Sequence, residues 1–346
     1  MVATVLPAFG LAQDEYRFRV FGNGLIHSTW LIESNDQEEK FILQKINHYV
    51  FKTPGDIATN IRLVENYLKQ FHPNYLFVAP VKTKMGEDLL DTGEEYYRLF
   101  PFVKGSHTID TVQEPLQAFE AAKQFARFTA FTTGLDINRL KITVPAFHDL
   151  SLRYQQFENA LLNGNRERIS GSNELIRFLQ LHRNIAGEFE YEKADFKIRV
   201  THHDTKISNV LFDEQDKGIC IIDLDTMMPG YFISDMGDMM RTYLSPVDEE
   251  EKDLSKIEIR PLFYKAIVEG YLSEMGRELT DFEKKYFHFS GKFMTYMQAI
   301  RFLTDYISND VYYGSKYEGH NFIRAQNQCT LLERLMEFES LAKKLF

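Results

Sequence analysis

The stretch THHDTKISNVLFD, from Thr201 to Asp213, decides how the rest of the chain is interpreted. It is a polar loop inside an apolar region, and residues 198–225 predict short strands on either side of it. Asp204 precedes Asn209 by five residues, and Asp223 follows Asn209 by fourteen, at the end of the apolar strand 218–222. The region therefore gathers oxygen-bearing side chains at the edges of buried strands.

These side chains have the spacing that phosphoryl transfer to a hydroxyl group requires. Such a transfer needs a carboxylate to orient and deprotonate the hydroxyl, and oxygen ligands to hold Mg²⁺ on the phosphates of ATP. His202, Asp204 and Asn209 fit the pattern H-x-D-x-x-x-x-N of kinase catalytic loops. We predict Asp204 as the catalytic base, Asn209 and Asp223 as metal ligands, and Lys206 as a catalytic side chain that reaches the transferred phosphate.

An isolated match to this pattern would usually be a turn with an Asx cap. Here it lies between apolar strands, and Asp223 and Asp225 follow at the proper distance, so we favour the catalytic interpretation. His202 is expected to brace the backbone through hydrogen bonds rather than to bind a metal. The role of His203 is left open.

The first hundred residues predict a small lobe built mainly of strands. The segment FGNGLIH, from Phe21 to His27, is expected to form a glycine loop at the tip of a hairpin. Gly22 and Gly24 would let backbone N–H groups approach phosphates, although two glycines alone more often mark an ordinary turn. Strands are predicted at 16–20, 28–34, 40–46, 77–83 and 96–103, and a helix at 54–70 with Thr53 as its N-cap.

After Gly105 the sequence changes to amphipathic helices. They are predicted from about 114 onward and at 151–163, 172–189, 254–275, 281–308 and 319–345. The fold class is therefore α+β: a bilobal, protein-kinase-like fold with a nucleotide-binding lobe at 1–103, a hinge at about 98–105 and a helical lobe at 106–346. No internal repeat is found.

The overall composition limits the classes of partner and the cellular location that can be expected. The net charge of −10 and the absence of a basic block argue against a nucleic acid. Cys220 and Cys329 lack metal or redox spacing and are expected to be buried thiols. With no apolar stretch long enough for a membrane and no convincing secretion signal, a cytoplasmic location is expected. The acidic runs near Glu94 and Asp248 are expected to be solvated surface, and the oligomeric state is left open.

Several segments resemble one known family. HHDTKISNVLFD resembles the HNDTKxNNVLxD segment of the N-acetylhexosamine 1-kinases, which belong to the aminoglycoside and choline kinase-like phosphotransferases. ICIIDLDTMMPG and SDMGDMMRT are similar to their metal-binding strand and the segment after it, and FGNGLIHSTWLI to their N-terminal hairpin. QAIRFLTDYISNDVYY is similar to the helix that closes their sugar site. The resemblance covers nearly the whole chain.

The resemblance implies further site residues. Asp225 would be an additional acidic group at the metal or the sugar, and Arg301 and Asp305 would bind sugar hydroxyls. Four residues apart, Arg301 and Asp305 share a helix face, so a surface ion pair is the alternative. Gln44 occupies the position of the usual third-strand lysine, and Lys45 points to the opposite face of the strand. Which side chain contacts the phosphates is therefore open, and the candidate nucleotide contacts are Gly22, Gly24, Gln44 and Lys45, with Arg98, Phe100 and Phe102 at the hinge.

The sequence thus predicts an ATP- and Mg²⁺-dependent kinase that phosphorylates the anomeric hydroxyl of an N-acetylhexosamine. One alternative is another small-molecule kinase of this fold, acting on choline, homoserine or an aminoglycoside. Choline would require an aromatic cage, and an aminoglycoside would require an acidic patch. The other alternative is a non-catalytic nucleotide-binding regulator, against which the presence of Asp204, Asn209 and Asp223 argues.

Overall fold

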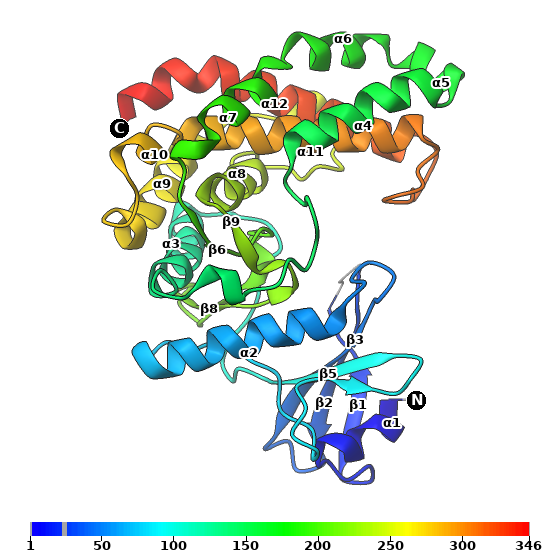
Figure 1. Cartoon of the computed structure of the whole chain (residues 1–346), viewed down its shortest axis with the longest axis vertical. Coiled ribbons are helices and arrows are strands. Elements are labelled where there is room, and N and C mark those ends of the chain that lie inside the picture. Colours follow the sequence, from blue (N-terminus) through cyan, green and yellow to red (C-terminus); the bar gives the residue numbers. More distant parts are fainter. Residues whose placement is uncertain (1, 23–25, 346) are drawn as a thin grey trace.

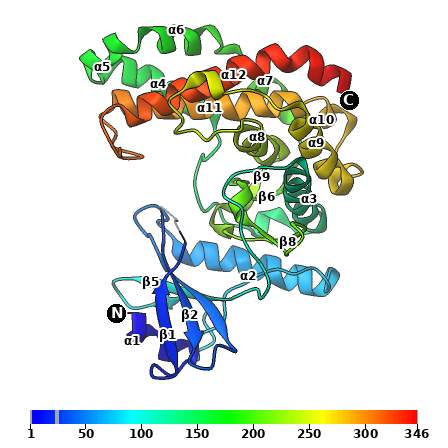
Figure 2. The same cartoon turned by 180° about the vertical axis from the view of Figure 1, so that it is seen from behind.

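Two lobes of different composition make up the computed structural model, which describes residues 2–22 and 26–345. The N-terminal lobe contains an antiparallel sheet and one long helix, and the C-terminal lobe is largely helical (Figure 1). This arrangement confirms the predicted α+β protein-kinase-like fold. Helix α2 (Pro54–Phe71) crosses between the sheet and the C-terminal lobe (Figures 1 and 2).

The sheet of the N-terminal lobe has five antiparallel strands in the order β1-β2-β3-β5-β4. One face covers a small core of its own, which Leu6, Ile32, Leu43 and Leu99 share with the N-terminal helix α1 (Val2–Val5). The predicted strands 16–20, 28–34 and 40–46 are confirmed. The strands are β1 (Tyr16–Val20), β2 (Ser28–Ser34), β3 (Lys40–Ile46), β4 (Leu90–Asp91) and β5 (Tyr96–Pro101).

One expectation in this lobe was wrong, and another, Thr53 as the N-cap of α2, is confirmed in position only. Residues 77–83 are not a strand, and only Val81 forms a bridge, to Leu99 of β5. Pro80 has no N–H to offer a ladder, so the outer partner of β5 is β4 instead. Thr53 precedes α2, but its side chain makes no capping hydrogen bond.

Helix α2 belongs to the core of the C-terminal lobe rather than to that of the sheet. Its buried face, with Ile57, Ile61, Val64 and Leu68, is continuous with the apolar cluster formed by the large helices. These helices are α3 (Pro115–Phe131), α4 (Leu150–Asn163), α5 (Arg166–Gly171), α6 (Asn173–Leu181), α7 (Asn184–Glu192), α8 (Phe232–Tyr243), α9 (Pro261–Met275), α10 (Asp281–Lys284), α11 (Phe287–Ile307) and α12 (His320–Leu345). Among the described buried residues of the sheet strands, only Ile46 at the end of β3 lies in this cluster, so most of the sheet and α2 are packed in two different cores.

The predicted helix boundaries in this lobe needed three corrections. Predicted helix 172–189 is divided between α6 and α7, and predicted helix 281–308 between α10 and α11. Predicted helix 254–275 begins only at Pro261, because proline fits the first turn of a helix and breaks its interior. Both cysteines are buried free thiols, as expected. Among the described residues, no helix is both long and apolar enough to span a bilayer.

Two pairs of short strands carry the polar loop quoted at the outset. Strand β6 (Ile198–Thr201) pairs with β9 (Met228–Tyr231), and β7 (Val210–Phe212) pairs with β8 (Gly218–Ile221). The loop 202–209 therefore leaves one pair and enters the other. The segment 222–227 runs back between the same two pairs, so the two segments lie next to each other.

Candidate active site

Helix α8 holds the backbone of the loop 202–209. The carboxylate of Asp235 accepts the N–H groups of His202 and His203, at 3.0 and 2.7 Å, and that of Asp238 accepts the N–H of Thr205 at 2.8 Å. The hydroxyl of Tyr243 donates to the carbonyl oxygen of Thr205. Burial raises the pKa of Asp235 to about 6, and the two N–H donors oppose that shift. The loop is therefore fixed through its main chain, which leaves its side chains available for chemistry.

Both histidines of the loop are structural. The ring nitrogen Nε2 of His202 lies 2.9 Å from the carbonyl oxygen of Ile222, so this residue braces the backbone, as predicted. The Nδ1 atom of His203 lies 3.1 Å from the carbonyl oxygen of Thr226. Burial lowers the pKa of His203 to about 4, so its ring is neutral near pH 7. The two rings therefore connect the loop to the segment 222–227.

Asp204 carries a charged and accessible carboxylate. Its Oδ1 atom lies 3.3 Å from Nζ of Lys206, and about a quarter of its side chain is exposed. Burial would raise the pKa of Asp204, but the charge and hydrogen bond of Lys206, together with the nearby His202 and Arg241, outweigh it and lower that pKa. The same pairing raises the pKa of Lys206. Asn209 donates its amide N–H to the carbonyl oxygen of Asp204 at 2.9 Å, which leaves its Oδ1 atom free to bind a cation.

Asp223 has the features of a metal ligand. Its backbone is left-handed, with φ at 61°, and its carboxylate makes no hydrogen bond or ion pair with the part of the chain that the structure describes. Crowding by protein atoms, followed by the charges of Asp225 and Asp204, raises the pKa of Asp223 to about 6, although the side chain itself remains accessible to solvent. A divalent cation would relieve this repulsion.

The residues therefore fit Mg²⁺, for which Asp223 and the Oδ1 atom of Asn209 would be the protein ligands. Two protein oxygens suffice for this ion when phosphates and water complete its shell. Residues 2–22 and 26–345 contain no group of three or more His, Cys, Asp or Glu side chains placed to hold a metal by themselves. The site thus suits a cation that is delivered with a nucleotide.

Asp225 joins the two lobes instead of facing solvent. Its carboxylate pairs with Arg98 of β5 on one side and with Nε2 of His27, at 2.6 Å, on the other. Arg98 in turn donates twice to Oε1 of Gln44, at 3.0 and 2.9 Å. Burial would raise the pKa of Asp225, but Arg98 and His27 outweigh it and hold that pKa well below its ordinary range. Its predicted role at the metal or sugar stays a prediction.

The candidate nucleotide contacts lie on the strands and loop of the N-terminal lobe. Gly22 has φ at 75°, a conformation that favours glycine, whereas Gly24 lies outside the described residues. Lys45 pairs with Glu95 at 2.9 Å, on the other side of β3 from Gln44. At the predicted hinge, Phe100 packs against the guanidinium of Arg98, and Phe102 makes an edge contact with Phe21 at the start of the glycine loop.

Arg301 and Asp305 of α11 do not form the surface ion pair that their spacing allows. The guanidinium of Arg301 lies over the rings of Phe147, Tyr312 and Tyr313, at 5.4 to 5.7 Å from their centroids. No carboxylate pairs with Arg301 among the described residues. The buried carboxylate of Asp305 accepts the backbone N–H groups of Tyr312 and Tyr313, at 2.7 and 2.9 Å.

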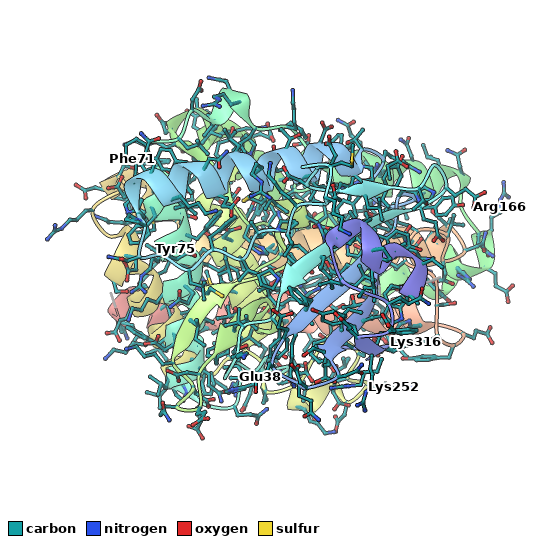
Figure 3. All side chains as sticks on the ribbon, turned by 90° about the horizontal axis from the view of Figure 1, so that it is seen from below. Glu38, Phe71, Tyr75, Arg166, Lys252 and Lys316 are labelled. Carbon is teal, nitrogen blue, oxygen red and sulfur yellow. The ribbon has the colours of Figure 1, made fainter. Side chains whose placement is uncertain are left out.

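This cluster adjoins the catalytic loop. The rings of Phe147 and His203 lie 6.4 Å apart, and those of His148 and His203 5.4 Å apart. The Arg301 cluster therefore contacts the catalytic loop at His203, the residue that precedes the proposed base. Figure 3 shows Lys316, from the segment that follows α11, on the same side of the molecule as Arg166 and away from Phe71 at the end of α2.

Sequence reasoning missed three residues that organise the site, Asp235, Asp238 and His27, and it named a fourth, Arg98, only as a nucleotide contact. Asp235 and Asp238 hold the catalytic loop, and His27 and Arg98 hold Asp225 through their side chains. SDMGDMMRT contains the first two, but only the later spatial contacts reveal their roles. In the acidic run near Asp248, Asp248 and Asp253 are exposed as expected, but Glu249 pairs with both Arg241 and Arg324.

The fold and this site define a class of protein, and comparison with known proteins agrees. The model of the phosphotransferase enzyme family APH matches residues 17–279, so the chain belongs to that family. It is therefore an ATP-dependent kinase of small-molecule hydroxyl groups.

Solved structures with the same fold extend over almost the whole chain. A microcompartment-associated aminopropanol kinase has a TM-score of 0.63 at 14% identity, covering 99% of this chain and 97% of its own. An aminoglycoside phosphotransferase from Alicyclobacillus acidocaldarius has a TM-score of 0.61 at 13% identity, with coverage of 96% and 94%. A spectinomycin phosphotransferase, in complex with ADP and spectinomycin, has a TM-score of 0.58 at 12% identity, with coverage of 94% and 93%. At these identities the similarity shows a shared fold and says nothing about the substrate.

Proposed function

We propose that this chain transfers a phosphoryl group from ATP to the anomeric hydroxyl of an N-acetylhexosamine, giving N-acetylhexosamine 1-phosphate and ADP. The observation that carries the proposal is Arg301, a partly buried arginine without a carboxylate partner among the described residues, in an aromatic cluster beside the catalytic loop. Its guanidinium offers donors for sugar hydroxyls or an acetamido oxygen. The aromatic rings offer apolar faces for a pyranose ring.

The same cluster argues against a cationic acceptor. Aminoglycosides and aminopropanol, named for two proteins of the same fold, carry amino groups. A cationic acceptor would meet the unpaired charge of Arg301. A quaternary ammonium such as choline would need the faces of Phe147, Tyr312 and Tyr313, and Arg301 already lies over them. A neutral acceptor fits both observations.

In the proposed reaction, Asp204 accepts the proton of the attacking hydroxyl while that oxygen bonds to the γ-phosphorus and the bond to the ADP oxygen breaks. Lys206, 3.3 Å from Asp204, orients the carboxylate and offers a positive charge to the transferred group. Asn209 and Asp223 would hold Mg²⁺, which would neutralise charge on the phosphates. Asp305 holds Tyr312 and Tyr313 in the acceptor cluster, and its oxygens can accept one further hydrogen bond.

Two measurements test the substrate and the position of phosphorylation. ADP release is followed with N-acetylglucosamine, N-acetylgalactosamine, choline, homoserine and an aminoglycoside, and only the hexosamines are expected to support turnover. In phosphorus NMR of the product, the phosphate is expected to couple to a single anomeric proton. Coupling to a methylene group would instead indicate a 6-phosphate and contradict the proposed position. Turnover with none of these acceptors would favour the non-catalytic regulator.

The variant Arg301→Ala tests the observation that carries the proposal. It is expected to raise the KM for the hexosamine about tenfold or more while leaving the KM for ATP nearly unchanged, because Arg301 is expected to contact only the acceptor. Arg334→Ala is the matched control, since Arg334 lies on α12 in an exposed pair with Glu337. An equal loss for both substrates would remove Arg301 from the acceptor site.

A further inference from the structure

Most of the sheet of the N-terminal lobe belongs to a different core from helix α2, and among the described buried residues of its strands only Ile46, at the end of β3, reaches the cluster of α2, so apolar packing between the two is limited. The sheet shares its apolar cluster with the N-terminal segment, whereas α2 shares that of the C-terminal helices. The sheet carries the candidate nucleotide contacts, and the C-terminal lobe carries Asp223. A productive site requires the two to be held in one orientation.

One buried group of side chains supplies such a connection. Arg98, Asp225 and His27 have side chains that are 3, 2 and 7% exposed, and Asp225 contacts both of the others. The Nδ1 atom of His27 accepts the backbone N–H of Asn47 at 3.0 Å, so Nε2 bears the proton and donates it to Asp225. Each oxygen of Asp225 thus receives a donor from the sheet side of the molecule.

A second contact holds the other end of the same segment. Asn60 of α2 is fully buried and donates to the carbonyl oxygens of Met227, at 3.0 Å, and Lys141, at 2.9 Å. Residues 225–227 are therefore held at one end by the sheet and at the other by α2. Asp223, two residues before Asp225, keeps its left-handed backbone next to these fixed points.

We propose that Arg98 and Asp225, with His27, form an interlobe latch in which Arg98 is the positioning residue that fixes Asp223 relative to the nucleotide-binding sheet. Arg98 is the cross-strand partner of Gln44, which fills the place of the third-strand lysine. The positive charge that Gln44 does not supply comes from the neighbouring strand, and Gln44 orients it through two hydrogen bonds. The part that concerns Asp223 rests on the function proposed above.

Hydrogen exchange tests the latch in the full-length chain without substrate. In Arg98→Met, amides of residues 224–227 are expected to exchange about tenfold faster or more, because the segment loses its connection to the sheet. Arg127→Met is the matched control: Arg127 pairs with Glu274 within the C-terminal lobe, and its loss is expected to leave this segment unchanged. Unchanged exchange in Arg98→Met would overturn the latch.

A double variant separates the latch from the energetics of buried charge. Arg98→Met leaves Asp225 as a buried carboxylate with one partner fewer, which lowers stability. Arg98→Met with Asp225→Asn removes both charges, so its melting temperature is expected to rise above that of the single variant while the fast exchange persists. Recovery of both properties would mean that Arg98 only compensates a charge, and would overturn the proposal.

Kinetics give the consequence for the site. Arg98→Met is expected to raise the Mg²⁺ concentration for half-maximal activity about tenfold and to change the KM of the acceptor less than about twofold, because Asp223 is displaced and the acceptor cluster is not. Equal changes in both constants would contradict a positioning role. Fast exchange in a chain that phosphorylates no hexosamine would leave the latch standing and the proposed substrate refuted.

Discussion

Two loops are held in the same way: the catalytic loop 202–209 and the loop that carries Tyr312 and Tyr313, which we call the acceptor loop for its proposed role. In the first, Asp235 of α8 accepts the consecutive N–H groups of His202 and His203. In the second, Asp305 of α11 accepts the consecutive N–H groups of Tyr312 and Tyr313. Each carboxylate is buried on a helix and fixes a loop that carries other chemistry.

The loops differ in what they present. The catalytic loop offers Asp204 and Asn209, whose roles follow from their own chemical groups. The acceptor loop offers aromatic rings to Arg301, a residue of the helix. An aspartate on a helix of the site can therefore act by holding a loop. The presence of a carboxylate does not by itself mean that the residue contacts the reacting groups. The following variants separate side chains that react from those that hold.

The largest effect is expected for Asp223→Ala. Loss of this carboxylate removes a proposed direct ligand of Mg²⁺, so activity should be abolished through loss of metal-bound nucleotide. Titration calorimetry with Mg-ATP checks the cause, and excess chelator should abolish the activity of the unmodified chain. Wild-type affinity for Mg-ATP in the variant would refute the role of Asp223, and full activity in chelator would refute the need for a metal.

The second-largest loss of activity is expected for Asp204→Asn. The substitution keeps the shape and removes the carboxylate, so kcat is expected to fall by about 10²–10⁴-fold while ATP binding and the melting temperature are kept. Asp281→Asn is the matched control, because the side chain of Asp281 is 99% exposed. Near wild-type turnover of Asp204→Asn would end its assignment as the base.

Asp235→Asn tests the holder of the catalytic loop. The amide can accept only one of the two backbone N–H groups, and its own N–H₂ faces the other. A fall in kcat of about tenfold to a hundredfold is expected, with little change in either KM, because the base is displaced but the binding groups are not. A change confined to KM would contradict this.

Asp305→Asn is the corresponding change in the acceptor loop, and the comparison predicts a different kinetic signature. The KM of the hexosamine should rise about threefold to tenfold, while kcat and the KM for ATP stay nearly constant. Steady-state kinetics with each substrate varied in turn measure all three. If kcat fell as is expected for Asp235→Asn, the two loops would not have separate kinetic roles.

The difference between the loops also explains how far sequence could predict this molecule. The strands β1 to β3 and the catalytic loop were predictable, because alternation and a local motif determine them. Residues 77–83 were mispredicted as a strand, because Pro80 blocks a ladder. Thr53 was correctly placed at the N-cap position before Pro54, but the absence of a capping hydrogen bond from its side chain could not be predicted.

Side-chain pairs that are distant in sequence could not be predicted. Arg98 and Asp225 are 127 residues apart, and nothing in the sequence indicates that these two side chains contact each other. Glu249 is similar: in sequence it belongs to an acidic run, and in space it lies between two arginines. Its pairing gives the last and smallest prediction.

Glu249 connects the two loops that the comparison treats as separate. Arg241, one of its partners, also pairs with Asp238, which holds Thr205 in the catalytic loop. Arg324, the other, lies 5.2 Å from the ring of Tyr313 in the acceptor loop. Burial would raise the pKa of Glu249, but the two arginines outweigh it and lower that pKa to about 2.

Because the folded-state pKa of Glu249 lies below the ordinary 4.5, its ionised form stabilises the fold above pH 4.5, and this contribution is lost as the pH falls toward 2. About a quarter of the side chain is exposed, so solvent screening reduces the contribution to about 1 kcal/mol. Glu249→Gln should therefore unfold at lower denaturant concentration than wild type at pH 7, and the difference should shrink between pH 4.5 and pH 3. A difference that is the same at every pH would mean that Glu249 acts through packing. A fall in kcat together with a rise in hexosamine KM would show that its two arginines couple the loops.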